Sequence, residues 1–391
     1  MIEPGTRRRG DRLRWATASE LLRLVQREPG ITRRDAGERL GMSSGALAET
    51  VERLRDASLL SEQRAATVGR GRPTTTLEPH ERGPLVIAVE LLARAWSVSV
   101  ADLAGRMTPV ASGGYGTGLD EPAAAVEHAY RQADGRVRAV VAVAAGTVSG
   151  TRLVQFPTRG WADVELSVLV AGIPPQAQVS FLAGNDATLA GLAEANTGAA
   201  RDASVVLYLL VSEGLGGALL VDGRPVPGAH GRGGEFGHLP FGDPALECPC
   251  GARGCWGRTV DGAALARLLG EPEPQEPEAY ARRVLADPAA LSAAQGVAGA
   301  LGAGLAGLVN AHDPDLVILG GLAPLVRTAA RDTFMHSYTR GLMLASRAAP
   351  PAVVDGAYDA DGPARGAVHL GLEHVTDLPA LALWKDLAAA G

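Results

Sequence analysis

Three cysteines and one histidine form the densest cluster of chemically reactive residues in the sequence. Cys248, Cys250 and Cys255 are the only cysteines of the chain, and His238 precedes the first of them by ten residues. One imidazole and three thiolates are a complete tetrahedral ligand set for Zn²⁺, with no position left open for a substrate. The spacing therefore predicts a structural zinc site that joins two loops and contributes folding free energy. The alternatives are three free cysteines in a loop, or a redox site, although the C-x-C spacing differs from the C-x-x-C pattern of redox motifs.

A second group of residues suits contact with DNA. We expect a short helix over 32–40, a turn at Gly41 and a further helix over 44–56. Together they give the spacing of a helix-turn-helix, whose last helix enters the major groove with its N-terminal side chains near base edges. A preceding helix is expected over 17–27, with Thr17 as its N-cap. The candidate DNA contacts on these helices are Ser43, Ser44, Arg33, Arg34 and Arg53.

The segment after these helices has the composition of a wing. Residues 59–79 contain two short stretches that predict strands, with the run Gly-Arg-Gly-Arg-Pro over 69–73 between them. Flexible glycines beside Arg70 and Arg72 suit insertion into the narrow, electronegative minor groove. We therefore predict a winged helix-turn-helix domain over residues 1–82 that binds double-stranded DNA. The alternative is a helical dimerisation head, because helix-turn-helix patterns also arise by chance.

The distribution of charge indicates different functions for the N-terminal segment and the rest of the chain. The chain has 391 residues, with 37 Lys+Arg against 43 Asp+Glu and a formal net charge of −6. The first 82 residues have a balance of +4, whereas residues 83–391 have a balance of −10. A basic head on an acidic body indicates an anionic partner for the head. The 46% share of hydrophobic residues excludes a disordered chain.

Nothing in the sequence predicts export or membrane insertion. The N-terminal residues are charged and lack the apolar centre of a secretory signal, and no uninterrupted run of about 18 apolar residues occurs. Three cysteines cannot form a full set of disulfides, which favours a reducing compartment. We expect a cytoplasmic protein with no membrane partner.

Residues 83–391 alternate between strand-like and helix-like stretches. Apolar runs and alternating patterns predict strands over 85–89, 96–101, 137–144, 179–182, 205–211 and 316–319, and helical stretches include 187–195 and 298–310. Strands mixed with helices predict an α/β fold, arranged here as two lobes. No internal repeat is visible as residue identity, although two similar lobes remain compatible with the sequence.

Two runs of residues resemble the signature of the ROK family of repressors and sugar kinases: Gly-Glu-Phe-Gly-His over 234–238 and Cys-Pro-Cys-Gly-Ala-Arg-Gly-Cys over 248–255. The resemblance covers almost the whole chain, because the winged helix is similar to the head of ROK repressors, which ROK kinases lack. The Asn-Asp-Ala run over 185–187 and the glycine pair at 320–321 match further family motifs. The resemblance implies a two-lobed, actin-like and ribonuclease-H-like fold of the ATPase type, with the zinc motif at 238–255.

The chain departs from the family at the phosphate-binding turn. Family kinases place a D-x-G-x-T-like motif after the first strand, where this sequence has Glu90, Leu91 and Leu92. Bulky leucines prevent the close approach of backbone N–H groups to nucleotide phosphates. We therefore expect no enzymatic activity; the alternative from another class is an ATP-dependent sugar kinase with an added DNA-binding domain.

The resemblance also implies a sugar pocket that is partly kept. Its polar groups are Asn185, Asp186, Glu235 and His238. By the same resemblance, His238 binds zinc through one nitrogen and presents the other to the ligand. Asp186, a general base in family kinases, would here accept a hydrogen bond from a sugar hydroxyl.

Two departures count against an unmodified hexose in this pocket. Gly257 stands where the family usually has a glutamate, and the loop over 157–161 lacks the usual asparagine. Arg159 in that loop suits an anionic ligand such as a sugar phosphate or sugar acid, and it suits a solvated loop charge equally well. Trp161 suits both a sugar face and a hydrophobic core.

These patterns predict a ROK-type DNA-binding transcriptional regulator, a repressor of carbohydrate-related genes whose DNA binding responds to a sugar or sugar derivative. A homodimer or homotetramer would present paired winged helices to a pseudo-palindromic operator. A regulator without a sugar ligand is a further alternative, and Gly257 favours it.

Overall fold

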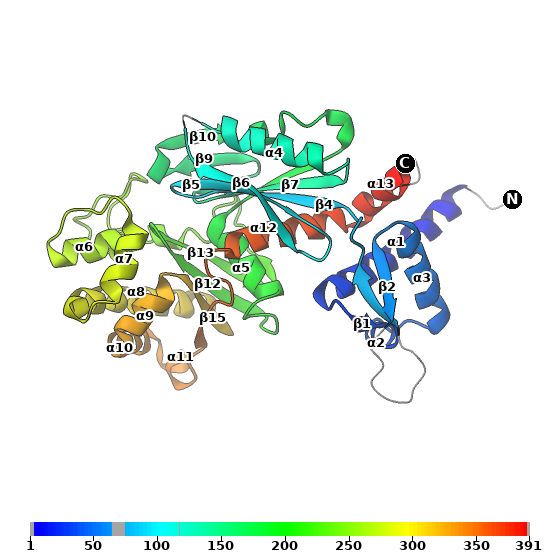
Figure 1. Cartoon of the computed structure of the whole chain (residues 1–391). Helices are drawn as coiled ribbons and strands as arrows, with labels where there is room; N and C mark the ends of the chain where they lie inside the picture. The colour runs from blue at the N-terminus through cyan, green and yellow to red at the C-terminus, as the bar shows by residue number, and fades with distance from the viewer. Residues whose placement is uncertain (1–3, 65–74, 117, 389–391) are drawn as a thin grey trace.

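The computed structural model describes residues 4–64, 75–116 and 118–388. The chain forms a small N-terminal head and a larger body of two α/β lobes, as Figure 1 shows. The predicted wing tip with Arg70 and Arg72 lies outside the described residues.

The head contains the predicted helix-turn-helix. α2 (Arg33–Arg39) begins after Thr32, and α3 (Ser44–Asp56) begins after Ser43; the hydroxyl of each of these two residues accepts a backbone N–H from the first turn of its helix. Gly41 has a φ of 61°, a left-handed conformation that glycine adopts without strain, and it turns the chain between the two helices. Both predicted helices are confirmed.

A small antiparallel sheet completes the winged fold. β2 (Leu60–Arg64) and β3 (Thr75–Pro79) form the predicted wing, and β1 (Ile31–Thr32) pairs with the other side of β3. The sequence pattern missed β1 because two residues are too short for a periodic signal. The fold of the head is therefore a winged helix-turn-helix.

The first helix is longer than expected. α1 spans Pro4–Arg27, so the predicted start at Thr17 is wrong. The residues between Pro4 and Thr17 contain no further proline, and Trp15 is buried in the core of the head. Since the helix continues through Thr17, this residue is not an N-cap.

The body contains two five-stranded sheets with the same topology. Their strand orders are β6-β5-β4-β7-β11 and β14-β13-β12-β15-β16. In each sheet the first three strands form an antiparallel meander, and the last two add in parallel on the other side of the first strand. This duplication is the two-lobed, actin-like fold that the family resemblance implied.

The strands of the body have the following bounds. Lobe 1 contains β4 (Leu85–Leu91), β5 (Ala95–Ala101), β6 (Met107–Gly114), β7 (Val137–Ala144) and β11 (Ser180–Asn185), with a small sheet of β8 (Thr147–Ser149), β9 (Arg152–Phe156) and β10 (Trp161–Glu165). Lobe 2 contains β12 (Val205–Val211), β13 (Leu215–Val221), β14 (Arg224–Pro225), β15 (Leu316–Gly321) and β16 (Ala352–Asp355).

Two crossing helices join the lobes. α5 (Asp186–Asn196) follows the last strand of lobe 1 and packs on β13 of lobe 2, whereas α12 (Gly362–Val375) follows the last strand of lobe 2 and packs on β4 and β7 of lobe 1. Figure 1 shows this pair between the two sheets. A Cβ on Gly366 would lie 1.8 Å from the backbone oxygen of Leu189, so the close contact of the two helices requires glycine here.

The remaining helices pack around the two lobes, and the last of them, α13 (Leu378–Ala388), packs against α1 of the head and against α12. They are α4 (Asp120–Gln132), α6 (Gly262–Leu269), α7 (Pro277–Leu285), α8 (Leu291–His312), α9 (Ala323–Ala329), α10 (Arg331–Gly341), α11 (Leu344–Ala348) and α13 (Leu378–Ala388). Within the described ranges, the segment Pro288–His312 is long and apolar enough to span a membrane, but 61% of its most apolar window is buried inside the body. It packs as the central helix of lobe 2, against α10.

The C-terminal end of the chain holds the head. The indole Nε1 of Trp384 on α13 donates a buried hydrogen bond of 2.8 Å to the backbone oxygen of Ala57, at the end of α3. The hydroxyl of Ser19 on α1 donates a buried bond of 2.6 Å to the backbone oxygen of Thr376. The head and the body therefore share one continuous hydrophobic core.

Candidate functional site

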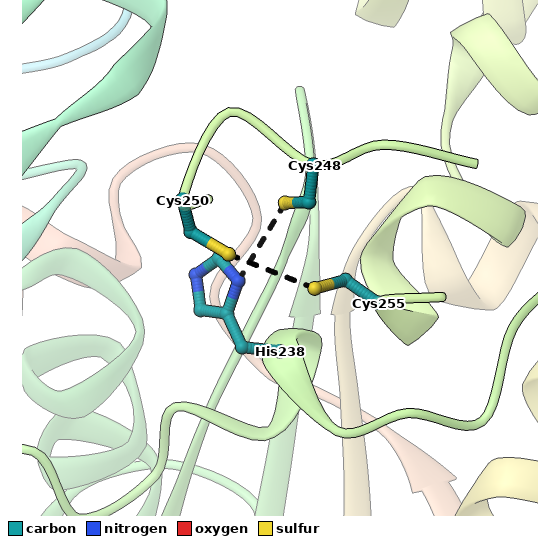
Figure 2. A group of neighbouring side chains, drawn as sticks. All are labelled: His238, Cys248, Cys250 and Cys255. Atoms are coloured by element: carbon teal, nitrogen blue, oxygen red, sulfur yellow. Dashed lines mark hydrogen bonds between the residues drawn. The ribbon is translucent and has the colours of Figure 1, made fainter. Parts of the chain in front are cut away.

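The four predicted metal ligands lie together, as Figure 2 shows. His238 ends the short 3-10 helix Phe236–His238, and Cys255 precedes the 3-10 helix Trp256–Thr259. Cys248 and Cys250 lie in a tight hairpin that is closed by a bridge between Glu247 and Arg253. The candidate ligand atoms all lie within 4.8 Å of one another.

The distances within this cluster fit tetrahedral coordination. Cys248 Sγ lies 3.8 Å from His238 Nδ1, and Cys250 Sγ lies 3.7 Å from Cys255 Sγ. A regular tetrahedron with Zn–S bonds of ~2.3 Å and a Zn–N bond of ~2.0 Å has edges of about 3.8 Å between sulfurs and about 3.6 Å between sulfur and nitrogen. Both of these separations are close to the tetrahedral edges, so the four side chains form a possible metal-binding site.

The second nitrogen of His238 faces the carboxylate of Glu235. The Nε2 atom lies 3.7 Å from Glu235 Oε2, while Nδ1 faces the cysteines. A carboxylate on the far side of a ligating imidazole fixes the tautomer and strengthens the metal ligand. Glu235 therefore connects the cysteine cluster to the neighbouring cleft.

A cleft of about 700 Å³ lies between the two lobes. The candidate ligand-binding residues from the sequence all line it: Asn185, Asp186, Glu235 and His238. The loop with Arg159 lines another wall, and Gly257 contributes backbone where the family usually has a glutamate. A volume of this size suits a small ligand with several hydroxyls.

Asn185 and Asp186 occupy the junction of β11 and α5. Asn185 caps α5 through its Oδ1, which accepts the backbone N–H of Thr188, and its Nδ2 donates to Asp186 Oδ1 at 2.9 Å. The backbone N–H of Ala187 donates to the same oxygen at 2.8 Å. Burial and, to a lesser extent, the nearby Glu235 raise the pKa of Asp186 to about 6, against the opposite effect of these two hydrogen bonds.

The structure reveals an ion pair across the mouth of the cleft that the sequence did not indicate. Arg94, in the turn between β4 and β5 of lobe 1, pairs with Glu213, in the turn between β12 and β13 of lobe 2. Each hairpin alone has an ordinary charged turn, and only the duplicated topology places the two turns opposite each other. Leu91 beside this turn is fully buried.

A second ion pair lines the cleft. Arg258 Nη1 lies 3.7 Å from Glu273 Oε1. Asp261, which is 2% exposed, caps α6 by accepting the backbone N–H of Ala264 at 2.8 Å, and burial raises the pKa of Asp261. No sequence pattern indicated these residues, because they follow the cysteine motif in a segment without periodicity.

Of the candidate DNA contacts at α3, the two serines are exposed and Arg53 is partly buried. Ser43 and Ser44 are exposed at its N-terminus, although the Ser43 hydroxyl is engaged as the helix cap. Arg53 pairs with Glu49 at 3.0 Å, one turn away on the same helix. Ser44 is therefore the residue of this group whose side chain is exposed and has no capping role.

The candidate arginines on α2 differ in their surroundings. Arg33 Nη2 donates to Glu62 Oε2 at 2.7 Å, which ties α2 to the wing strand β2. Arg34 is strongly exposed and pairs with Glu38 at 2.9 Å on the same helix. An exposed pair of this kind contributes little to stability, so Arg34 is free to exchange its carboxylate for a phosphate.

A winged helix-turn-helix head joined to a two-lobed body with a ligand-sized cleft defines the structural class of this chain. Comparison with known families agrees with this class. A winged helix-turn-helix DNA-binding profile matches residues 16–60, and the ROK family profile matches residues 116–374. The chain belongs to the ROK family.

Relatives of this chain include both kinases and repressors. It is 35% identical over 149 residues to an N-acetylgalactosamine kinase of Shewanella sp., a match that covers 35% of this chain and 48% of the relative. It is 28% identical over 170 residues to the xylose repressor of Bacillus subtilis, covering 43% and 44% of the two chains. The chain thus spans about half the length of these curated relatives.

A solved structure shares the whole architecture. It is the crystal structure of a ROK family transcriptional regulator, a homologue of the Escherichia coli MLC protein. The superposition has a TM-score of 0.74 at 20% identity and covers 96% of this chain and 99% of the other. This likeness establishes the fold of the head and body together.

Proposed function

We propose that this protein represses carbohydrate-related genes and that a sugar or sugar derivative, bound in the cleft between the lobes, alters its affinity for operator DNA. The proposal rests on one observation: the same chain has both an exposed candidate recognition helix, α3, and a cleft lined by Asn185, Asp186 and Glu235. We divide the chain into a DNA-binding domain, 1–82, and a sensing domain, 83–391. A homodimer or homotetramer in the cytoplasm would place two heads on one operator.

The absence of kinase activity is part of the proposal. The turn after β4 carries the Arg94–Glu213 ion pair and the buried Leu91 beside it, where a family kinase needs glycines around nucleotide phosphates. We expect no ATP hydrolysis and no phosphorylated product from a panel of hexoses and N-acetylhexosamines. Turnover of ATP that depends on any of these sugars would favour the kinase alternative.

The cluster of His238 and the three cysteines is proposed to bind structural zinc. Its four protein ligands complete a tetrahedron, so the ion would have no open position for chemistry. Zinc would join the hairpin over 248–255 to the 3-10 helix that directly follows Glu235, and it would thereby fix one wall of the cleft. The metal's part in function would be indirect, through the position of Glu235.

The DNA-binding part is tested with a charge placed on the recognition helix. Ser44 is exposed in the first turn of α3. In Ser44→Glu, a carboxylate stabilises a helix N-terminus but repels the DNA backbone. We expect at least a tenfold loss of affinity for the region upstream of the protein's own gene, measured by fluorescence anisotropy, with an unchanged melting temperature.

The matched control is Ser292→Glu, because Ser292 is also exposed in the first turn of a helix, α8, far along the chain in lobe 2. This variant should bind DNA as the wild type does. Equal affinity of Ser44→Glu and the wild type for DNA would contradict the assignment of α3 as the recognition helix.

The effector part is tested separately by isothermal titration calorimetry of the full chain with sugars and sugar derivatives, followed by anisotropy with each compound that binds. A binding compound that shifts DNA affinity supports the switch. Binding of DNA that no compound alters would contradict the switch while the DNA-binding function stands.

A further inference from the structure

Arg159 differs from the other cations of the cleft in having no acidic partner. Arg94 pairs with Glu213, and Arg258 lies 3.7 Å from Glu273. Within the described part of the chain, no hydrogen bond or ion pair joins Arg159 to another side chain, and its Nε is buried without a partner. A half-buried guanidinium without a carboxylate is costly, because the charge is partly desolvated and uncompensated.

Aromatic rings hold Arg159 in place. Its guanidinium carbon lies 4.4 Å from the ring centre of Tyr115 and 5.3 Å from that of Trp161. The two rings pack edge to face with their centres 5.3 Å apart, and Tyr115 donates its hydroxyl proton to the backbone oxygen of Leu92 at 2.9 Å. Cation–π contacts orient a guanidinium but leave its N–H groups without acceptors.

The local backbone presents this side chain to the cleft. Arg159 ends the 3-10 helix Pro157–Arg159 between β9 and β10, and Gly160, at a φ of 64°, turns the chain immediately after it. Pro157, Thr158 and Arg159 line the cleft together with Asn185, Asp186 and Glu235. The Trp161 ring packs behind Arg159 on Phe156, which is fully buried.

We propose that Arg159 receives the anionic group, a carboxylate or a phosphate, of a sugar derivative whose hydroxyls contact Asn185, Asp186 and Glu235. The proposal rests on the ligand-controlled function proposed above and specifies the chemical class of the effector. Arginine presents two parallel N–H groups that match the two oxygens of a carboxylate or phosphate, and the aromatic platform leaves those N–H groups available.

The test compares neutral and anionic members of matched sets. Full-length protein is titrated by calorimetry with glucose, glucuronate and glucose 6-phosphate, and with N-acetylgalactosamine and its 6-phosphate. We expect at least one anionic member to bind at least tenfold more tightly than its neutral parent. Glucuronate and glucose 6-phosphate separate the two sources of negative charge, and inorganic phosphate alone measures the contribution of the anion without a sugar.

Substitution of the arginine should remove this preference. In Arg159→Gln, the anionic member should lose at least tenfold in affinity while the neutral parent changes by less than about twofold, and Arg159→Lys should recover part of the loss. The matched control is Arg152→Gln, in the same β9–β10 hairpin, where Arg152 is exposed and pairs with Asp163 at 2.6 Å. Melting temperatures within a few degrees of the wild type verify that the variants fold.

Two results would overturn the proposal in distinguishable ways. Neutral sugars that bind as tightly as their anionic derivatives, or an anionic preference that survives in Arg159→Gln, would refute the role of Arg159 and leave the sugar-controlled function in place. If no member binds the wild type, both the role of Arg159 and sugar control fail, whereas the DNA-binding function is judged by its own assay.

Discussion

The surroundings of Asp186 have opposing effects on the pKa of its carboxyl group. The carboxylate accepts hydrogen bonds from Asn185 and from the backbone of Ala187, which favour its ionised form, yet burial and the nearby Glu235 favour the protonated form. The balance raises its pKa to about 6. A ligand hydroxyl that donates to Asp186 would stabilise the ionised carboxylate. Without a ligand, the ionised Asp186 lowers the free energy of unfolding at neutral pH.

The pH dependence of stability follows from this raised pKa. Folding disfavours the ionised form of Asp186, whose pKa is about 6 in the folded state against 3.8 in the unfolded state. Its contribution to the free energy of unfolding is therefore fully present below pH 3.8 and is lost as the pH rises through about 6. In Asp186→Asn the acceptor oxygen remains but the charge is absent. We expect the variant to gain on the order of 1–2 kcal/mol over wild type at pH 7, after allowing for partial exposure of the side chain, and nothing at pH 4.

Denaturant unfolding at a series of pH values measures this difference. Glu127→Gln, in which a partly exposed carboxylate of α4 that pairs with Arg131 is neutralised, is the control and should show no such gain. A difference between Asp186→Asn and wild type that is the same at pH 4 and pH 7 would contradict the raised pKa. Sugar affinity of Asp186→Asn should fall, since the strongest acceptor of the pocket is weakened.

The metal site allows a prediction at the same scale. Metal analysis should find about one zinc per chain, and Cys250→Ser should lose most of it with a lower melting temperature, because three ligands bind zinc far more weakly than four. Ala252→Ser, at an exposed position of the same hairpin, is the control and should keep its zinc. A chelator that removes zinc without any change in melting temperature would contradict a structural role.

At the scale of secondary-structure elements, the crossing helices α5 and α12 decide how closely the lobes approach. Gly366 of α12 faces the backbone of Leu189. Gly191 of α5 packs against the side chains of Tyr208 and Leu220, on neighbouring strands of the lobe 2 sheet. Small residues at these positions let helix backbones and strands approach closely. The cleft residues at the start of α5 are therefore positioned by packing at the middle of the same helix.

Two glycine-to-alanine variants test this packing with opposite expected signs. Alanine favours a helix interior over glycine by ~1 kcal/mol. Gly366→Ala should nevertheless destabilise the protein by several kcal/mol, because its Cβ would lie 1.8 Å from the Leu189 oxygen. Gly45→Ala in α3, where no atom lies within 4 Å of the added Cβ, should be neutral or stabilising. Equal stabilities of the two variants, measured by urea unfolding, would contradict the close contact.

Sequence patterns predicted the elements with strong local signals and missed those that depend on distant contacts. The N-caps at Thr32 and Ser43 and the apolar strand over 205–211 are local, and the structure has helices and a strand where they predict them. The true start of α1 at Pro4 was missed because the same capping pattern at Thr17 does not reveal whether a helix continues before it.

The candidate site shows the same division between local and distant signals. The four metal ligands were found because their residue types and short spacing are visible in one segment. The Arg94–Glu213 pair joins residues 119 positions apart and becomes visible only when the duplicated lobes face each other. The lack of an acidic partner for Arg159 is likewise a property of the folded environment, not of the loop sequence.

At the scale of the whole molecule, two helices attach the head to the body: α1 near the N-terminus and α13 near the C-terminus. Ser19 of α1 contacts Thr376, and Gln26 Nε2 donates to the backbone oxygen of Leu103 in lobe 1 at 3.1 Å. Trp384 contacts the head through Ala57 and lies under the guanidinium of Arg138 on β7, 5.1 Å from the ring centre. A movement of lobe 1 would therefore carry the head with it.

Trp384 contacts both the head and lobe 1, so its truncation should weaken the attachment of the head. Trp384 is 6% exposed, and truncation of a buried tryptophan to alanine costs about 3–5 kcal/mol. Because its ring packs between α3 and β7, this loss should fall on the attachment of the head. Trp384→Ala should raise the radius of gyration in small-angle X-ray scattering and expose the segment between β3 and β4 to protease. It should also weaken DNA binding, because in the proposed homodimer two freely moving heads would lose their fixed spacing.

The conservative variant separates packing from hydrogen bonding. Trp384→Phe keeps an aromatic ring but removes the Nε1–H donor to Ala57, so its cost should be limited to about 1–2 kcal/mol and its scattering profile should stay close to that of the wild type. If Trp384→Ala keeps the wild-type scattering profile and protease resistance, the head is held mainly by α1, and a ligand signal from the cleft must reach the DNA through Ser19 and Gln26. If both variants release the head, the hydrogen bond rather than the ring is the decisive contact.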